Sequence, residues 1–534
     1  MPISFDYVIV GAGSAGCILA DRLSESGNKS VALIESGGSN KSLWIDMPAG
    51  FSKTFYHKKY NYCYHTEKQV NLSNREIYVP RGKGLGGSGA INAMVYVRGH
   101  ETDFEDWQKA GAKGWSYNDI LPYFKKIEAH YLGDTLQHSS TGKIQISKPE
   151  SEAHPSCETF FQACEELGMP YQQDFNTGRL FGAGFYDANI GNGKRTSSAS
   201  TYLENARGRK NLTVFTNSQV ARINFNKRVA KSVVVLKEGR REEIVANSEI
   251  IVSAGAIDTP KLLMLSGLGD AEIARQHNIN LVRHMPAIGK NLQDHLCGVF
   301  KFRTKIKTLN DDFGSIYKQL LLGVQYIARR RGKLSISVNQ AGAFANDSKT
   351  NLPYAQLYFS PISYSAATKV GGLVRPDKNS GLMISYSPTK PSSRGYVTLA
   401  DSKPSTAPVI HPNYLSTEDD VLNVVRSAKL ALRVAETSPF SSILKSNSFS
   451  RLSDQELLQS FKENGSSIYH HCGTCAIGAD ESMSVVGANL KVHGIDKLRI
   501  VDASVFPTIT SANINAPTMM VAEKAAKLII DERK

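Results

Sequence analysis

Histidine and cysteine side chains gather in one short segment near the C-terminus, Tyr469-His470-His471-Cys472-Gly473-Thr474-Cys475. Histidine takes up and releases a proton near neutral pH, so the segment offers a base for catalysis. A Cys-x-x-Cys pair can instead form a redox dithiol or half of a zinc site. No second Cys-x-x-Cys and no distant His pair completes such a site in the sequence. We therefore predict no metal and favour proton transfer.

A glycine-rich turn near the N-terminus indicates a bound dinucleotide. The run Tyr7-Val8-Ile9-Val10 is typical of a buried parallel strand, and it leads into Gly11-Ala12-Gly13-Ser14-Ala15-Gly16, which fits G-x-G-x-x-G. Gly11 permits the tight turn, Gly13 lets a pyrophosphate approach, and Gly16 lets the next helix pack on its strand. A second strand, 31–34, ends at Glu35, which can accept hydrogen bonds from ribose hydroxyls and disfavours a 2′-phosphate. The motif alone does not separate NAD from FAD.

Length and composition describe an ordinary globular protein. The chain has 534 residues, of which 41% are hydrophobic and 21% charged, so two or three domains are expected. We find no secretory leader ahead of the first strand and no apolar run long enough to span a membrane. The odd number of scattered cysteines, 7, is typical of reduced thiols, so we predict a cytoplasmic location.

The formal net charge of +14 includes one dense cluster, Arg329-Arg330-Arg331-Gly332-Lys333. No nucleic-acid-binding motif accompanies it, so we predict no nucleic-acid partner. We favour the interpretation that these cations complement the C-terminal end of a helix over 316–331, which Gly332 ends. The alternative is peripheral docking on an anionic inner-membrane surface, from which the protein could reach a quinone pool.

The segments that would position these residues can be read along the chain. The glycine-rich stretch from Pro80 to Asn92 continues into an apolar run, so we expect its backbone to approach a ligand. Two helices are predicted over 101–130, the second capped by Ser116 and Asp119, followed by an irregular region over about 134–195. Alternating residues predict strands of a meander over 211–223 and 231–245, and a buried parallel strand over 249–254.

The remaining segments divide into two types. A helix is expected to start with Thr259 as its cap and Pro260 in its first turn. Between 299 and 465, strands over 354–360, 382–386 and 396–399 alternate with helices over 316–331 and 417–436, which indicates a sheet with helices on one side. The last segment returns to dinucleotide-type chemistry, with a strand over 498–502 that ends in Asp502 and a helix that begins at Asn515.

Five ordered motifs together resemble the glucose–methanol–choline (GMC) family of FAD-dependent oxidoreductases over essentially the whole chain. They are the N-terminal fingerprint, the 82–92 loop, the 255–269 segment, Gly289-Lys290-Asn291-Leu292-Gln293-Asp294-His295, and the tail from Val501 through Thr518. The pattern looks closest to the choline dehydrogenase-like and aliphatic alcohol dehydrogenase branch. The resemblance implies an α/β fold with FAD rather than NAD. It predicts a discontinuous Rossmann-type FAD-binding domain (1–150, 192–298 and 466–534) and an α+β substrate domain with an antiparallel sheet (151–191 and 299–465).

The resemblance also assigns roles within the site. His470 corresponds to the catalytic histidine of the family, and His471 stands where proline is usual. We predict that His471 points away from the flavin, because neighbouring side chains in an extended segment point to opposite faces. The second catalytic position lies just before the last helix, where we choose Asn515 and keep Asn513 as the alternative. An amide there can hydrogen-bond the developing alkoxide without competing for the proton.

The FAD is predicted to be non-covalent, because Ile91 stands where some relatives carry a flavin-linked histidine. Helix N-termini and glycine loops should supply most contacts to it. The predicted cofactor-binding residues are Gly11, Gly13, Ser14, Ala15, Gly16, Glu35, Ser36, Arg81, Gly82, Gly86, Gly87, Ser88, Asn92, Ala93, Val95, Val220, Ala254, Asp502, Ala503, Asn513, Pro517 and Thr518.

The predicted function is oxidation of a primary alcohol to the aldehyde, with hydride passing to flavin N5 and His470 as the base. The partners would be a small-molecule alcohol and an electron acceptor, which is a quinone, a dye-like acceptor or O2; a dehydrogenase is favoured over an oxidase. The alternative is a lyase on the same scaffold, a hydroxynitrile lyase or a light-driven fatty-acid decarboxylase. Tyr358, Phe359 and Tyr386 could face the flavin or be core aromatics. A monomer or homodimer is expected.

Overall fold

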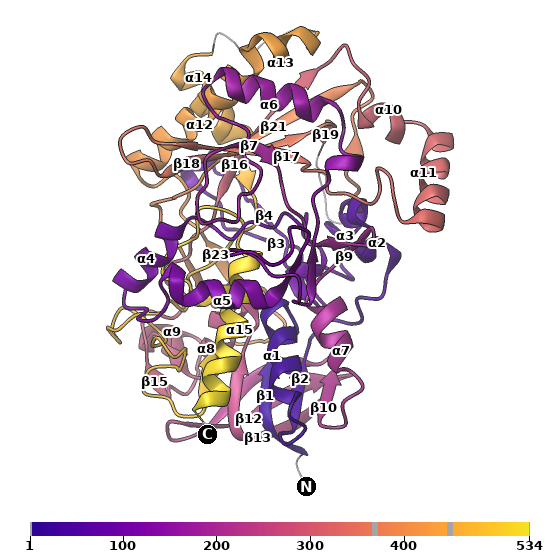
Figure 1. The fold of residues 1–534 in the computed structure, drawn as a ribbon. Helices are drawn as coiled ribbons and strands as arrows, with labels where there is room; N and C mark the ends of the chain where they lie inside the picture. Colours follow the sequence, from indigo (N-terminus) through magenta and orange to yellow (C-terminus); the bar gives the residue numbers. More distant parts are fainter. Residues whose placement is uncertain (1–2, 366–371, 446–451, 533–534) are drawn as a thin grey trace.

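The structure is a computed structural model that describes residues 3–365, 372–445 and 452–532 (Figure 1). Within these ranges the larger sheet has seven strands in the order β10-β2-β1-β13-β12-β11, with β25 also beside β13. Its strands are β1 (Ile3–Val10), β2 (Val31–Ile34), β10 (Leu212–Phe215), β11 (Gln219–Asn226), β12 (Val229–Lys237), β13 (Arg240–Val252) and β25 (Leu498–Ile500).

The parallel part of this sheet places the glycine turn. β1 lies between β2 and β13 and runs parallel to both, so its apolar side chains are covered on each face. The residues from Val8 to Val10 are at most 5% exposed. The helix α1 (Ser14–Ser24) follows directly after the turn, as predicted. Figure 1 shows α1 side by side with the final helix, α15 (Asn515–Asp531), with which it packs.

The structure corrects two of the predicted strands. Residues 231–245, predicted as one strand, hold β12 up to Lys237, a turn at 238–239 and the first part of β13. β13 then continues without a break through the predicted strand 249–254 as far as Val252. The pairing register between β13 and β1 shifts between Phe5 and Tyr7. This irregularity accommodates the polar residues that interrupt the apolar pattern of β13. Residues 211–223 hold two strands, β10 and β11, at opposite ends of the strand order. Asn217, with a φ of +52°, lies in the turn between them.

The helix α8 (Gly255–Leu265) begins earlier than predicted. Thr259 is not its cap, because the helix already starts at Gly255, and Pro260 lies inside it. Proline has no N–H to give to the carbonyl of Ala256, four residues earlier. The hydroxyl of Thr474 donates to that carbonyl instead, at 2.6 Å, which compensates the missing bond. Thr259 donates its own hydroxyl to Asp502, at 2.6 Å.

The second large sheet is antiparallel throughout. Its strand order among the described residues is β24-β16-β21-β18-β17-β7. The strands are β7 (Gly182–Phe185), β16 (Leu296–Arg303), β17 (Ala341–Asn346), β18 (Pro353–Ser360), β21 (Gly381–Pro388) and β24 (Ser466–Ser467). The predicted domain boundary at 298/299 therefore falls inside β16, and 466–467 pairs with this sheet. The domain boundaries stay a prediction.

Helices cover one face of the antiparallel sheet, at the top of Figure 1. They include α6 (Ser156–Glu166), α12 (Glu418–Glu436), α13 (Ser438–Ile443) and α14 (Asp454–Asn464). The region predicted as irregular therefore contains a helix, α6, whose phenylalanines Phe160 and Phe161 are buried in this core. The predicted helices α4 (Glu101–Lys109) and α5 (Tyr117–Ile127) are confirmed, with the capping box of Ser116 and Asp119 at α5.

No helix in the described ranges is both long and apolar enough to cross a membrane.

Candidate active site

A cavity of about 1160 Å³ lies between the two large sheets. Residues from the ends of β1 and β2 line one part of it, and residues from β16, β18 and β21 line another. The volume exceeds the roughly 300–1,000 Å³ of ordinary small-molecule pockets. The cavity is therefore large enough for an extended cofactor together with a small substrate.

Three helices begin at the cavity wall. Ser14 of α1, Gly255 of α8 and Asn515 of α15 all line the cavity and are the first residues of their helices. The free N–H groups and positive end of each dipole there favour an anionic ligand. Gly11, with a φ of +101°, makes the tight turn before α1, and a Cβ on it would lie 2.4 Å from the carbonyl oxygen of Ser253. Only glycine fits this turn.

Glu35 ends β2 and organises the neighbouring loops. Its carboxylate accepts hydrogen bonds from the backbone N–H groups of Ala12, Gly37 and Gly84, at 2.8–3.0 Å. Burial raises the pKa of Glu35, and these backbone donors oppose that rise. The carboxylate thus joins the turn before α1 to the glycine-rich loop while it lines the cavity.

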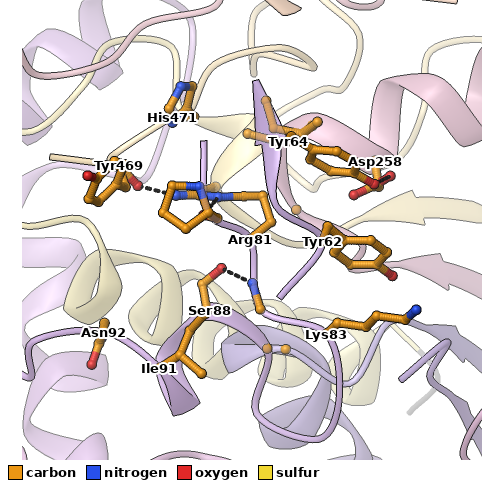
Figure 2. A pocket seen from close by; sticks show the side chains of 18 of the residues that line it. Tyr62, Tyr64, Arg81, Lys83, Ser88, Ile91, Asn92, Asp258, Tyr469 and His471 are labelled. Atoms are coloured by element: carbon orange, nitrogen blue, oxygen red, sulfur yellow. Dashed lines mark hydrogen bonds between the residues drawn. The ribbon is translucent and has the colours of Figure 1, made fainter. Parts of the chain in front are cut away.

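The glycine-rich loop lies against the fingerprint turn. A Cβ on Gly87 would lie 2.8 Å from the Cα of Gly13, so the two backbones touch. Figure 2 shows Ser88 accepting a hydrogen bond from the N–H of Gly82, at 3.1 Å, and Arg81 donating to the carbonyl of Tyr469. The expectation that this backbone approaches a ligand fits its place in the cavity wall.

The structure brings most of the predicted cofactor residues to the cavity. Gly16, Gly86 and Pro517 of the predicted set do not line it. Gly16 supports the turn from behind, because a Cβ there would lie 1.9 Å from the carbonyl oxygen of Gly11. Gly86 donates its N–H to the carbonyl of Ala12, at 2.7 Å. The lining residues of the set are Gly11, Gly13, Ser14, Ala15, Glu35, Ser36, Arg81, Gly82, Gly87, Ser88, Asn92, Ala93, Val95, Val220, Ala254, Asp502, Ala503, Asn513 and Thr518.

His470 lies between a second histidine and an asparagine. Its Nδ1 is 3.0 Å from Nδ1 of His295, and its Nε2 is 3.2 Å from Nδ2 of Asn513. Asn515, the predicted partner, instead accepts a hydrogen bond from the hydroxyl of Ser14, at 2.7 Å. The contact with His470 therefore favours Asn513, the alternative named above, because the start of α15 turns Asn515 toward the fingerprint helix; which asparagine acts in catalysis stays a prediction.

The tautomer of His470 follows from the backbone of Thr389. The carbonyl oxygen of Thr389 is 2.9 Å from Nε2 of His295, and a carbonyl only accepts, so His295 carries its proton on Nε2. Burial lowers the pKa of His295 to about 4, so this ring is neutral and its Nδ1 is an acceptor. His470 must then donate from Nδ1, which leaves its Nε2 without a proton.

A separate hydrogen-bond chain orients Asn513. The hydroxyl of Tyr186 donates to the carbonyl of Leu357, at 2.7 Å, so its oxygen accepts from Nε2 of Gln356, at 3.2 Å. The same nitrogen of Gln356 faces Oδ1 of Asn513, at 3.4 Å. Asn513 therefore presents its N–H2 group to His470. Two independent chains thus place a proton acceptor and a hydrogen-bond donor side by side at the cavity wall.

Burial and the neighbouring basic groups keep His470 neutral. Loss of water around the ring is the largest cause of a pKa well below the ordinary value of 6.5, and His295, Arg81 and His471 add to it. The neutral imidazole is the form that accepts a proton, so these surroundings keep His470 in the form that can act as a base.

His471 and the cysteines lie away from this pair. The His471 ring is fully buried, with Nε2 3.5 Å from a carboxylate oxygen of Asp294, and burial lowers its pKa well below 6.5. His471 is nevertheless one of the residues that line the cavity. Cys472 and Cys475 belong to the hydrophobic core, and burial raises the pKa of both thiols. Their packing does not favour dithiol chemistry.

The antiparallel sheet separates the predicted aromatics. Tyr358 lines the cavity, together with Tyr364 and Tyr469. Phe359 and Tyr386 pack in the core beneath the helices. Neighbouring residues of a strand point to opposite faces, which explains why Tyr358 and Phe359 differ.

Sequence analysis missed three residues of the site. His295, just before β16, and Gln356 orient His470 and Asn513, and Cys297 of β16 lines the cavity. His295 was visible as the end of a quoted motif, although nothing in the motif indicates its contact with His470. Nothing in the sequence around Gln356 indicates its role. Gln356 reaches Asn513 only because the pairing of strands in the antiparallel sheet places it there.

Family models agree with this geometry. The N-terminal GMC oxidoreductase model matches residues 5–297, and the C-terminal one matches residues 391–522. The chain belongs to the GMC oxidoreductase family. The predicted family and α/β fold are thereby confirmed, and the family binds FAD rather than NAD.

Relatives match over nearly their full length. The chain is 38% identical to the oxygen-dependent choline dehydrogenase of Vibrio vulnificus, covering 99% of this chain and 95% of the relative. It is 35% identical to an alcohol dehydrogenase [acceptor] of Pseudomonas putida, covering 98% and 96%. Among solved structures, formate oxidase has a TM-score of 0.92 with 26% identity, covering 99% of each chain. Pyridoxine 4-oxidase has a TM-score of 0.88 with 29% identity, covering 98% of each.

Proposed function

We propose that this GMC oxidoreductase oxidises a primary alcohol to the aldehyde, with His470 as the base and Asn513 as its partner. The observation that carries the proposal is the pair of atoms at 3.2 Å, the unprotonated Nε2 of His470 and the N–H2 group of Asn513. A substrate hydroxyl that enters between them can give its proton to the first and accept a hydrogen bond from the second. The resulting alkoxide is stabilised as its charge develops.

The cavity fits FAD. Glycines without room for a Cβ, the starts of three helices and the carboxylate of Glu35 line one connected volume, which suits a pyrophosphate and a ribose. When bound, FAD supplies the oxidant that takes a hydride from the alcohol carbon. The start of α15, with Asn513 and Thr518 in the cavity wall, would place its positive end toward the reacting part of the cofactor.

We expect an uncharged alcohol rather than a quaternary ammonium alcohol. The side chains near His470 in the cavity wall are aromatic or neutral, such as Tyr358, Tyr469 and Cys297, whose pKa burial raises to about 12. A cationic substrate would prefer a carboxylate there, whereas the charged side chain that acts on His470 is cationic Arg81. Five acids line the cavity, and none is among the groups that shift the pKa of His470. Glu35 and Asp502 accept hydrogen bonds from backbone donors at the dinucleotide end, and Asp258 accepts one from the hydroxyl of Tyr64; the other two are Glu67 and Glu76.

The substrate is tested by anaerobic mixing of the oxidised holoenzyme with choline, benzyl alcohol and a medium-chain alkanol in turn. We expect the neutral alcohols to bleach the flavin bands faster than choline does. Faster bleaching by choline would contradict the substrate assignment but leave alcohol oxidation intact. Admitting air afterwards separates an oxidase from the dehydrogenase that we favour, whose acceptor would be a quinone or a dye.

The pH dependence should report the lowered pKa of His470. A base with a lowered pKa stays unprotonated to more acidic pH, so activity is lost only as the pH falls through that low value. We expect the rate of flavin reduction to stay level from about pH 8.5 to about pH 6.5 and to decline only below. Stopped-flow reduction across this range checks it. A decline centred at 6.5 or above would show that His470 is not shielded as described.

The FAD is proposed to be held without a covalent bond. Ile91, 5% exposed in the cavity wall, has no nucleophilic atom to attach to the flavin. Acid or heat denaturation followed by filtration should release all of the yellow colour from the protein. Flavin absorbance that stays with the precipitated chain would contradict this prediction.

The relatives named above are dehydrogenases and oxidases, and nothing favours the lyase alternative. The cytoplasmic location and the oligomeric state, monomer or homodimer, stay predictions.

A further inference from the structure

Helix α11 (Ile316–Arg329) presents apolar side chains to solvent. Only Tyr326 of its side chains is buried. A helix of a globular protein normally turns its apolar face toward the core, so this arrangement is inverted. The exposed apolar residues are Ile316, Tyr317, Leu320, Leu321, Val324 and Ile327, each between 51% and 77% exposed. We call these six residues the apolar stripe.

The stripe is continuous because its residues recur at spacings of three and four, which is one side of a helix. The opposite side holds the helix on the protein through Tyr326, whose hydroxyl donates to the carbonyl of Gly193, at 3.0 Å. Figure 1 shows α11 at the edge of the molecule, with no other labelled element outside it. The stripe therefore faces away from the body of the protein.

Cations accompany the stripe. The helix itself carries Lys318 and Arg329 and no acidic residue, and Arg331 follows it. Arg329 and Arg331 are exposed and form no ion pair with another described residue. Asp312, on the preceding helix α10 (Leu309–Phe313), pairs with Lys333 and lies 3.9 Å from Lys318. Free positive charge thus remains at the C-terminal end of α11. The helix ends at Arg329 with Arg330 as its cap, at a φ of +53°, so it ends before Gly332, the residue predicted to end it.

We propose that α11 is an interfacial helix that docks the protein on an anionic lipid bilayer. An exposed apolar stripe next to unpaired arginines is the pattern of helices that lie in the plane of a membrane surface. The helix is about 21 Å long, too short for a hydrocarbon core of about 30 Å, so it would lie on the membrane and not cross it. Lipid fits better than a second copy of this chain, because each copy carries a net charge of +14.

Docking through α11 would place one side of the active-site cavity near the membrane. The segment after the helix runs close to the cavity, since Leu334 accepts a backbone hydrogen bond, at 3.3 Å, from Ala49, two residues before the lining residue Phe51. Val338 and Asn339, a few residues further on, line the cavity itself. The helix α2 (Leu43–Asp46), which packs on the strand next to Gly193, also exposes Leu43 and Trp44. A lipid-soluble alcohol or electron acceptor would then have a short path to the site.

The test is cosedimentation of the flavin-loaded full chain with vesicles of phosphatidylcholine alone or with about 30% phosphatidylglycerol. We expect binding to the anionic vesicles that is at least about ten-fold stronger than to the neutral ones. The double change Leu320→Glu and Ile327→Glu should reduce it by about ten-fold or more, because it places charge on the buried side of the docked helix. Arg329→Gln with Arg331→Gln should weaken only the anionic preference.

The matched control is Leu422→Glu, an equally exposed leucine (66%) on α12, which should bind vesicles like the unchanged protein. Retained flavin absorbance shows that each variant is folded. Equal pelleting with and without lipid, or binding that the two glutamates leave unchanged, would overturn the proposal. So would light scattering that shows a dimer made monomeric by the same glutamates, with no vesicle binding, because the stripe would then join two copies.

Discussion

Replacing His470 by alanine is expected to slow flavin reduction by alcohol about 10²–10⁴-fold while FAD stays bound. The imidazole is the group whose unprotonated Nε2 faces the cavity, and the carbonyl of Thr389 holds that tautomer through His295. Without the imidazole, the proton of the substrate hydroxyl must be transferred to water. Rapid anaerobic mixing measures the rate constant of bleaching directly, and the flavin absorbance of the purified variant reports occupancy.

The neighbouring histidine provides a matched comparison. The ring of His471 is fully buried and its pKa is also lowered well below 6.5, yet it packs toward Asp294 and not toward Asn513. We expect His471→Ala to change the bleaching rate of the bound flavin less than about ten-fold, below the range for loss of a positioned base. A larger loss in His471→Ala than in His470→Ala would show that the roles are reversed.

Replacing Asn513 by alanine should lower the rate of flavin reduction about 10²–10³-fold, the usual range for removing one donor to a developing oxyanion. Gln356 and Tyr186 behind it set the orientation of this amide, so its N–H2 group is ready before substrate binds. The pH profile should keep its shape, because His470 remains. Single-turnover reduction at several pH values checks both expectations.

Asn515→Ala is the control that separates the two candidate asparagines. Its side chain accepts the Ser14 hydroxyl at the start of α1, so its loss should weaken FAD retention and leave the reduction rate of bound flavin nearly unchanged. If Asn513→Ala and Asn515→Ala slowed flavin reduction equally, contact with His470 would not be what determines which asparagine acts in catalysis. A loss confined to Asn515→Ala would restore the original sequence-based assignment.

The dinucleotide unit could be predicted almost residue by residue. Its signals are local: an apolar strand, a glycine turn whose φ and close contacts exclude other residues, and an acid at the end of the next strand. The same holds for capped helices such as α5, whose capping box is a four-residue pattern.

Predictions that depended on long-range pairing were less accurate. The break expected between 245 and 249 is absent from β13, because its polar residues resemble a turn in the sequence but lie where β1 pairs with Ile244–Val252. The start of α8 was misplaced, since the role of Pro260 depends on a hydroxyl from Thr474, more than 200 residues away. The sequence could not decide between Asn513 and Asn515 for a similar reason, because only contacts with His470 and Ser14 distinguish these two amides.

Alcohol oxidation with His470 as the base is tested by anaerobic titration of the oxidised holoenzyme with a neutral primary alcohol, with the aldehyde quantified at each step. We expect one aldehyde to form for each flavin bleached, and both processes to slow together in His470→Ala. Product formation with the flavin still oxidised, or bleaching that His470→Ala leaves at the rate of the unchanged protein, would contradict it.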